Sequence, residues 1–504
     1  MMLGGAPVLV VGAGIMGTGI AQVAAQAGHQ VLLFDAREGA ATQARLRLAT
    51  QLEALAANGK LAPDTASAAL ANVEPVQSLE SAHHAGLVVE AIVEEADAKR
   101  ALLRRLETIV ATDCILASNT SSLSITALAK GMGRPGRLVG MHFFNPVPVM
   151  KLVEVVSGLH TEPTVATAIF DLAKAWGKVP VHARSTPGFI VNRIARPFYA
   201  EALALLQEQA TVPAVLDACL RGAGFRMGPC ELMDLIGHDT NFAVTQSLYA
   251  ASFFDKRYVP SIVQRDLVDG GLLGRKSGRG FYRYPEGPPT LARVAYAAPD
   301  APREIAVHGD DAVADWIEQT VRAKGIAATH RVRDSGWTGL ALGLTSEAAR
   351  LVLTDGRCAG QIRAESGARQ IAVFDRPVQG PAGGSTVLAY AVAGACSESW
   401  RAQAAAWLAQ LGFAPQLVAD TPGLLVARTT GMLINEASDA VLQGVCSIES
   451  ADAAMKLGVN YPAGPFEWLA GWSVRGVVRL LEALDTHYRG ERYRASPWLL
   501  RQHP

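Results

Sequence analysis

The chain has 504 residues, which at about 150 residues per domain is enough for roughly three or four domains with buried cores. Lys plus Arg and Asp plus Glu both number 46, so the formal net charge is zero and no basic excess indicates a nucleic-acid partner. Half of the residues are hydrophobic, but no uninterrupted apolar run reaches the roughly 18 residues of a membrane-spanning helix. The composition therefore argues against a nucleic-acid-binding protein and against a membrane-spanning one.

The N-terminus and the cysteines bear on the compartment. The first apolar run has no Lys or Arg before it and is interrupted by glycines, so we interpret it as a strand and turn and not as a signal peptide. We therefore expect a cytoplasmic enzyme. The six cysteines form no CxxC pair, which predicts free thiols and neither a disulfide framework nor a zinc site. They are Cys114, Cys219, Cys230, Cys358, Cys396 and Cys446.

A glycine-rich turn follows the first predicted strand, Pro7–Val11, and precedes helix-forming sequence. Gly12 permits a tight turn, Gly14 lets the backbone approach a pyrophosphate, and Gly17 allows close packing of helix on strand. Such glycines also occur as plain structure, and it is their place between a strand and a helix that favours dinucleotide binding. We assign to the cofactor Gly12, Gly14, Ile15, Met16 and Gly17.

An acidic residue ends the second predicted strand, Val31–Phe34. Asp35 lies 18 residues after Gly17, where a carboxylate can bind a ribose 2′-hydroxyl. This predicts NAD as the cofactor in preference to NADP. Arg37 could assist a 2′-phosphate, but Asp35 would repel one.

Strands and helices then alternate, as in a doubly wound parallel sheet. Predicted strands are Leu87–Val93 and Cys114–Ser118, with a helix over Lys99–Val110 between them. The polar turn Asn119–Leu123 follows at a strand's carboxyl end, the edge where ligands bind in such sheets. Its serines are equally well explained as an ordinary helix cap.

Two short apolar runs, Leu138–Met141 and Lys151–Val156, are joined by a proline-containing loop. His142 stands where the first run ends, and Glu154 lies inside the second. If the runs pair, the carboxylate can bond one ring nitrogen, which fixes the tautomer and leaves the other nitrogen free to take a proton. The alternatives are a buried structural histidine and a solvated glutamate, but the nucleotide fold beside this pair favours a general base.

A helical domain follows and is then repeated. We predict it over Ser185–Tyr284, with Asn192 early in a long helical region. The segment Asp420–Arg428 matches Ser185–Arg193 at an offset of 235 residues, which indicates a duplication. Between the copies, strand-like and helix-like pieces alternate without a GxGxxG, so we expect one active site, in the first half.

The resulting fold class is α/β plus all-α. An N-terminal Rossmann-type doubly wound sheet is followed by a helical domain, a degenerate α/β segment and a second helical copy. The expected domains are residues 1–184, 185–284, 285–410 and 411–504.

The motifs GAGIMG, SNTSSL, HFFNPVPVMKLVEVV, TPGFIVNR and GRKSGRGFY together resemble the 3-hydroxyacyl-CoA dehydrogenase family. The resemblance covers residues 8–284, and its helical part recurs at 420–504. The double length is similar to bacterial 3-hydroxybutyryl-CoA dehydrogenases, including those linked to phenylacetate breakdown. It implies an oxidoreductase that converts an (S)-3-hydroxyacyl-CoA to a 3-oxoacyl-CoA with NAD, in fatty acid metabolism of the β-oxidation type.

The same resemblance implies roles for single residues. His142 is the general base, Glu154 is its partner, and Ser121 and Asn192 contact the reacting end of the substrate. Single-copy relatives dimerise through their helical domains, which implies either a homodimer or a monomer with an internal pseudo-dimer of helical domains. In the second copy Ala427 replaces Asn192, so we expect that copy to serve structure. The family's cofactor contacts fall on Glu94, Lys99, Ser121, Asn145 and Lys276.

Two other functions are compatible with parts of the sequence. The chain could oxidise a free hydroxy acid or sugar acid, because related dehydrogenases share this architecture; a basic patch at Arg45, Arg47 and Lys60 would favour a CoA thioester instead. It could also be a non-catalytic, crystallin-like nucleotide-binding protein. The joint retention of four residues argues against that class: His142, Glu154, Ser121 and Asn192.

Overall fold

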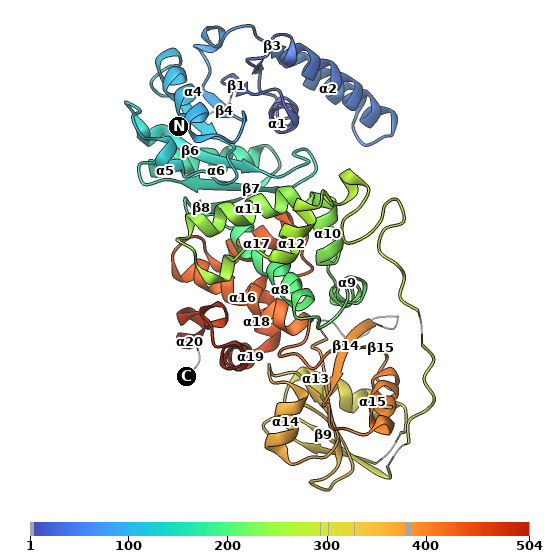
Figure 1. Ribbon diagram of the computed structural model, residues 1–504. Helices are drawn as coiled ribbons and strands as arrows, with labels where there is room; N and C mark the ends of the chain where they lie inside the picture. Colours follow the sequence, from blue (N-terminus) through green and yellow to red (C-terminus); the bar gives the residue numbers. More distant parts are fainter. Residues whose placement is uncertain (1–4, 293, 301, 327, 378–385, 503–504) are drawn as a thin grey trace. The chain divides into compact units, whose positions relative to one another are not determined.

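The computed structural model describes residues 5–502 except 293, 301, 327 and 378–385 (Figure 1). The chain divides into two compact units. The first consists of residues 1–193 and 440–459, and the second of residues 194–439 and 460–504.

The first unit contains an eight-stranded sheet in the order β3-β2-β1-β4-β5-β6-β7-β8. Neighbouring strands run parallel except for β6 and β7. Strands β1, β4 and β5 are buried at every position, as expected for a parallel sheet covered on both faces. The elements are β1 (Val8–Val11), α1 (Ile15–Gln26), β2 (Val31–Phe34), α2 (Ala40–Ala57), α3 (Pro63–Ala71), β3 (Val73–Pro75), β4 (Leu87–Glu90), α4 (Ala96–Ile109), β5 (Ile115–Ser118), α5 (Ile125–Leu128), β6 (Leu138–Phe143), β7 (Leu152–Ser157), α6 (Pro163–Ala175), β8 (Val179–Arg184) and α17 (Ile448–Gly458).

The strand ends differ from the predicted ones. Strand β4 ends at Glu90, three residues before the predicted end at Val93. Strand β6 extends beyond Met141 to Phe143, because Phe143 pairs with Val153 of β7. His142 is therefore inside a strand and directly opposite Glu154.

The second unit contains helices of both copies and a seven-stranded mixed sheet in the order β10-β9-β11-β12-β13-β14-β15. The helical elements are α8 (Arg196–Gln207), α9 (Pro213–Gly222), α10 (Pro229–Ile236), α11 (His238–Ala251), α12 (Ile262–Asp269), α16 (Val426–Leu442), α18 (Pro465–Trp472), α19 (Val474–Tyr488) and α20 (Pro497–Gln502). The sheet and its helices are β9 (Glu304–His308), α13 (Ala312–Ala323), β10 (Ala328–Val332), β11 (Gly339–Leu342), β12 (Ala349–Leu353), α14 (Ala359–Ser366), β13 (Ile371–Phe374), β14 (Thr386–Val392), α15 (Glu398–Gln410) and β15 (Phe413–Leu417).

The end of the second sheet repeats that of the first. Strands β13 and β14 are antiparallel and β14 and β15 parallel, as are β6–β7 and β7–β8. Asp375, directly after β13, accepts hydrogen bonds from the amides of Leu425 and Val426 at 2.9 and 2.7 Å. The predicted fold class, with its degenerate α/β segment, is confirmed.

One helix of each copy packs on the sheet of the other half. Helix α17 of the second copy packs on β7 and β8, whereas its counterpart α9 of the first copy packs on β14. Glycines permit both contacts: a Cβ at Gly458 would lie 2.7 Å from Leu152 Cδ2, and one at Gly222 would lie 2.7 Å from Val387 O. The two halves of the duplication therefore exchange one helix each, an arrangement that the sequence did not reveal.

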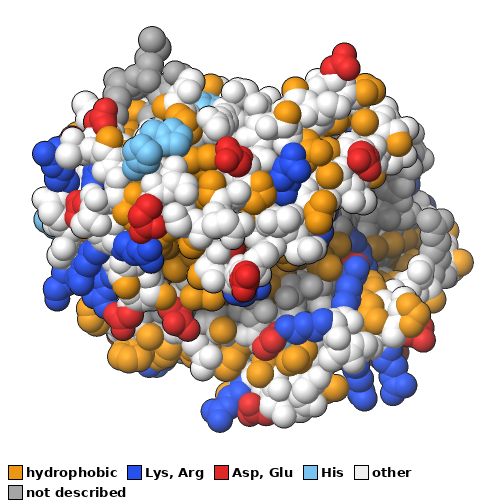
Figure 2. Space-filling model, turned by 90° about the horizontal axis from the view of Figure 1, so that it is seen from above, with side chains coloured by type: hydrophobic (Ala, Val, Ile, Leu, Met, Phe, Trp, Pro, Cys, Tyr) orange, Lys and Arg blue, Asp and Glu red, His pale blue; other side chains and the backbone are white. Residues whose placement is uncertain are grey.

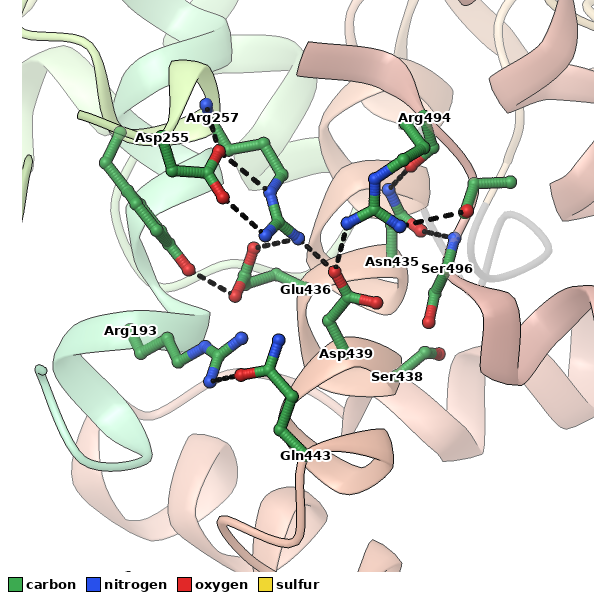
Figure 3. A network of polar contacts seen from close by, with 12 residues as sticks. Arg193, Asp255, Arg257, Asn435, Glu436, Ser438, Asp439, Gln443, Arg494 and Ser496 are labelled. Atoms are coloured by element: carbon green, nitrogen blue, oxygen red, sulfur yellow. Dashed lines mark hydrogen bonds and ion pairs between the residues drawn. The ribbon is translucent and has the colours of Figure 1, made fainter. Parts of the chain in front are cut away.

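Reciprocal ion pairs join the two helical copies within the second unit. The Glu201 carboxylate accepts from Arg428 at 2.8 Å and from Arg492 at 2.8 Å. In the matching position Glu436 pairs with Arg257 at 3.2 Å, and Arg257 also pairs with Asp439 (Figure 3). Arg492 and Arg257 are 235 residues apart, as are Glu436 and Glu201, so the contacts follow a pseudo-twofold relation.

Basic and acidic side chains are interspersed on the face shown in Figure 2, separated by hydrophobic and neutral ones. Within the described part of the chain, no helix is long and apolar enough to cross a membrane. All six cysteines are free.

Candidate active site

The glycine turn forms a concave approach to the N-terminus of α1. Gly12 has φ +108°, and a Cβ there would lie 2.4 Å from Ala91 O; a Cβ at Gly17 would lie 1.8 Å from Gly12 O. Both positions therefore require glycine. A Cβ at Gly14 would meet no described atom within 4 Å, and no side chain caps α1. Open backbone amides at a helix N-terminus fit the pyrophosphate of a dinucleotide.

Asp35 is held beside this turn. Its Oδ2 accepts from the Ala13 amide at 2.8 Å, and Arg37 pairs with the carboxylate through Nε at 3.0 Å. The hydrogen bond from Arg37 lowers the pKa of Asp35 to about 2, so the carboxylate is charged at neutral pH. This charge and position suit a ribose 2′-hydroxyl and oppose a 2′-phosphate. Ile15, 78% exposed at the start of α1, lies beside the same turn, and Met16 follows it.

Glu94 organises the polar turn after β5. Its Oε1 accepts from the Thr120 hydroxyl at 2.6 Å and from the amides of Ser121 and Ser122 at 2.8 and 3.1 Å. The Glu94 carboxylate therefore closes the turn. The alternative explanation, an ordinary helix cap by Ser121 or Ser122, does not account for these contacts. Ser124, further along, caps α5.

Lys99 lies beneath this turn in a buried ion pair. Its ammonium is 2.6 Å from Glu90 Oε1 and 3.2 Å from Glu94 Oε2, and its side chain is only 1% exposed. This geometry favours a role in holding Glu94 over direct contact with a cofactor. Glu90 was missed from the sequence, although a charged residue at the end of an otherwise apolar strand is a usable signal.

His142 and Glu154 form the central pair. The His142 Nδ1 lies 2.6 Å from Glu154 Oε2, and both residues are buried. The other oxygen, Oε1, accepts from the amides of Ile190 and Val191 at 3.0 Å each, where α7 (Val191–Ile194) begins. Both oxygens of the carboxylate are thus engaged, so the imidazole is held in one orientation through Nδ1, and Nε2 takes no part in this contact.

Two aromatic rings flank the imidazole. The Phe144 ring centroid is 4.5 Å from that of His142, and the Phe189 centroid is 5.9 Å away. Neither phenylalanine was assigned from the sequence. Their apolar rings limit the access of water to the histidine.

The remaining predicted residues lie at different places. Asn192 donates from Nδ2 to Ser121 O at 3.3 Å, so the structure brings these two together in the first unit. Asn145 is exposed in the loop after β6. Lys276 belongs to the second unit, where it pairs with Asp239 at 2.5 Å.

The second sheet has a different arrangement at the corresponding turn. Asp311 caps α13, and its Oδ1 accepts from the amides of Val313 and Ala314 at 3.0 and 2.9 Å. A carboxylate therefore occupies the helix N-terminus that is open in α1. This agrees with a single dinucleotide site, in the first half. No cluster of metal-ligating side chains occurs among the described residues.

Three family models match the chain. The 3-hydroxyacyl-CoA dehydrogenase NAD-binding domain matches residues 7–186, and the C-terminal domain of the same family matches residues 188–284 and 423–502. The 3-hydroxybutyryl-CoA dehydrogenase reduced Rossmann-fold domain matches residues 351–422. A 3-hydroxyadipyl-CoA dehydrogenase of Escherichia coli is 43% identical over 503 residues, covering 100% of this chain and 98% of that protein. The chain belongs to the 3-hydroxyacyl-CoA dehydrogenase family.

Solved structures agree with this assignment. A 3-hydroxybutyryl-CoA dehydrogenase from Escherichia coli K12 aligns with a TM-score of 0.88 and 40% identity, covering 99% of this chain and 98% of that one. An (S)-3-hydroxybutyryl-CoA dehydrogenase from Ralstonia eutropha, at 41% identity and a TM-score of 0.54, covers 55% of this chain and 98% of its own. The predictions of an NAD-dependent oxidoreductase and of NAD as cofactor are confirmed at the level of the family. The roles of single residues stay predictions.

Proposed function

We propose that this 3-hydroxyacyl-CoA dehydrogenase oxidises an (S)-3-hydroxyacyl-CoA to the 3-oxoacyl-CoA, with His142 as general base. The observation that carries the proposal is the buried His142–Glu154 bond, whose carboxylate is anchored by two backbone amides. NAD, when bound, supplies the hydride acceptor. His142 Nε2 takes the hydroxyl proton, Glu154 stabilises the resulting imidazolium, and Ser121 and Asn192 orient the substrate oxygens.

The acyl-CoA class rests on the relatives. Two of them bear different substrate names, 3-hydroxyadipyl-CoA and 3-hydroxybutyryl-CoA. The anticipated basic patch gives limited support for a CoA thioester. Arg45 donates a hydrogen bond from Nε to Val73 O at 2.8 Å, whereas Arg47 and Lys60 are exposed. A free hydroxy acid therefore remains the second candidate. The cytoplasmic location and the link to phenylacetate breakdown stay predictions, as does the oligomeric state.

One assay distinguishes the substrates. NADH oxidation is measured with 3-oxoacyl-CoA thioesters of increasing chain length, including acetoacetyl-CoA and 3-oxoadipyl-CoA, beside the matching free 3-oxo acids. We expect turnover of thioesters only. Equal turnover of the free acids would favour the hydroxy-acid dehydrogenase, and no turnover of any substrate would favour the non-catalytic class.

Cofactor choice gives a separate prediction. The Asp35→Ala variant should lose preference for NADH and gain activity with NADPH, because Arg37 is released from its ion pair and can bind a 2′-phosphate. The measurement is kcat/KM with each cofactor. Adding Arg37→Ala should remove the gain, and Arg37→Ala alone should leave the use of NADH nearly unchanged. A wild-type enzyme that uses both cofactors equally would show that our interpretation of Asp35 is wrong.

A further inference from the structure

A cavity of about 450 Å³ lies in the second unit, and none of its lining residues belongs to the proposed dehydrogenase site. This volume is within the roughly 300–1,000 Å³ range of small-molecule pockets. Three tryptophans line it, Trp316 from α13 and Trp468 and Trp472 from α18. Its walls therefore combine aromatic and aliphatic side chains.

Two residues of the wall carry buried polar atoms. Thr430 is 3% exposed and Trp468 is 7% exposed, and neither the Thr430 hydroxyl nor the Trp468 indole N–H has a partner among the described residues. Both of these atoms are covered by protein and do not open onto the cavity, so a ligand must be bound through another group of the wall.

Arg376 supplies a positive charge to the same wall. Its guanidinium carbon lies 4.5 Å from the Trp472 ring centroid. Burial lowers the pKa of Arg376 to about 10, but the group is still charged at neutral pH. The acidic residue of the wall, Glu467, already accepts from the Gly464 amide at 2.9 Å as part of a helix cap. The charge of Asp311 also acts on Arg376, but its carboxylate is engaged by two backbone amides of α13 and by the Thr338 hydroxyl. Arg376 is therefore the charged group of the wall that suits an anion.

The position of the cavity in the duplicated fold supports the same conclusion. Val426 and Ala427 line it, and Ala427 stands at the place of Asn192 in the first half. The second half thus has a cavity at this helix and lacks the amide, and Asp311 occupies its dinucleotide position. A site of this kind can bind a ligand without dehydrogenase chemistry.

We propose that this cavity binds a small carboxylate with an apolar or aromatic body. Arg376 holds the carboxylate, and the indole rings enclose the body. Charge-assisted hydrogen bonds supply the selectivity for an anion, and aromatic burial supplies the affinity for the body.

The test uses 4-phenylbutyrate as probe and 4-phenylbutan-1-ol as its uncharged counterpart, in titration calorimetry of the full-length protein. We expect one-to-one binding of the acid with quenching of tryptophan fluorescence, and binding of the alcohol weakened about tenfold or more. No binding of the acid up to millimolar concentration, or equal binding of acid and alcohol, would overturn the proposal.

Variants place the probe in this cavity. Arg376→Gln should weaken binding of 4-phenylbutyrate about tenfold or more. The matched control is Arg350→Gln, because Arg350 also stacks on a tryptophan, Trp337 at 5.4 Å, but lies outside the cavity. The Arg350→Gln protein should bind 4-phenylbutyrate within about twofold of the wild-type affinity. Thermal midpoints identify any variant that fails to fold. Unchanged affinity in folded Arg376→Gln protein contradicts the proposal.

Discussion

The His142→Gln variant should turn over about 10²–10⁴-fold more slowly than the wild-type enzyme while binding NADH nearly as well. Glutamine can keep a hydrogen bond to Glu154 but cannot accept the substrate proton. His142 is buried and its Nδ1 is engaged by Glu154, so the loss concerns the proton acceptor and not the dinucleotide turn. The measurements are kcat with acetoacetyl-CoA and NADH, and NADH binding by fluorescence titration.

A control for this variant exists in the same sheet. His182 on β8 is exposed and stacks on Phe170 with ring centroids 4.3 Å apart, away from Glu154. His182→Gln should retain wild-type turnover. If His142→Gln were as active as His182→Gln, His142 would have no part in the mechanism.

The fragment 1–284 should not behave as a well-folded, fully active monomer. It lacks α17, which covers β7 and β8, and it lacks Arg428 and Arg492, which neutralise the fully buried Glu201. Removing the partner of a buried charge typically costs about 3–5 kcal/mol, in addition to the apolar surface that becomes exposed. We expect a dimer or an aggregate.

The pseudo-twofold contacts specify the dimer. Arg257 of one fragment can take the place of Arg492 beside Glu201 of another, because both arginines occupy the same position in their copies. Light scattering after gel filtration gives the mass. Glu201→Ala should weaken the fragment's dimer, whereas Arg265→Ala, on the exposed face of α12, should not. An active monomer of residues 1–284 would contradict the idea that the second copy replaces a partner subunit.

The sequence by itself determined much of the dehydrogenase site. The glycine turn, Asp35 and the His142–Glu154 pair could be predicted because each depends on local spacing. His142 and Glu154 are only 12 residues apart, so a single strand pair brings them together. The duplication could be predicted as well, because matching residues at a constant offset are recognised in the sequence without a structure.

Only the tertiary structure decided which surfaces the two halves exchange. The Arg428–Glu201 pair joins residues 227 positions apart, and α17 reaches β7 from about 300 residues away, so no local pattern encodes either contact. The buried Lys99–Glu90 pair and the cavity at Arg376 likewise depend on burial. The sequence does not show which polar residues are buried. Long-range packing sets the free energy of these groups, because a buried charge or an unpartnered hydroxyl loses its hydration and destabilises the fold unless another group compensates it.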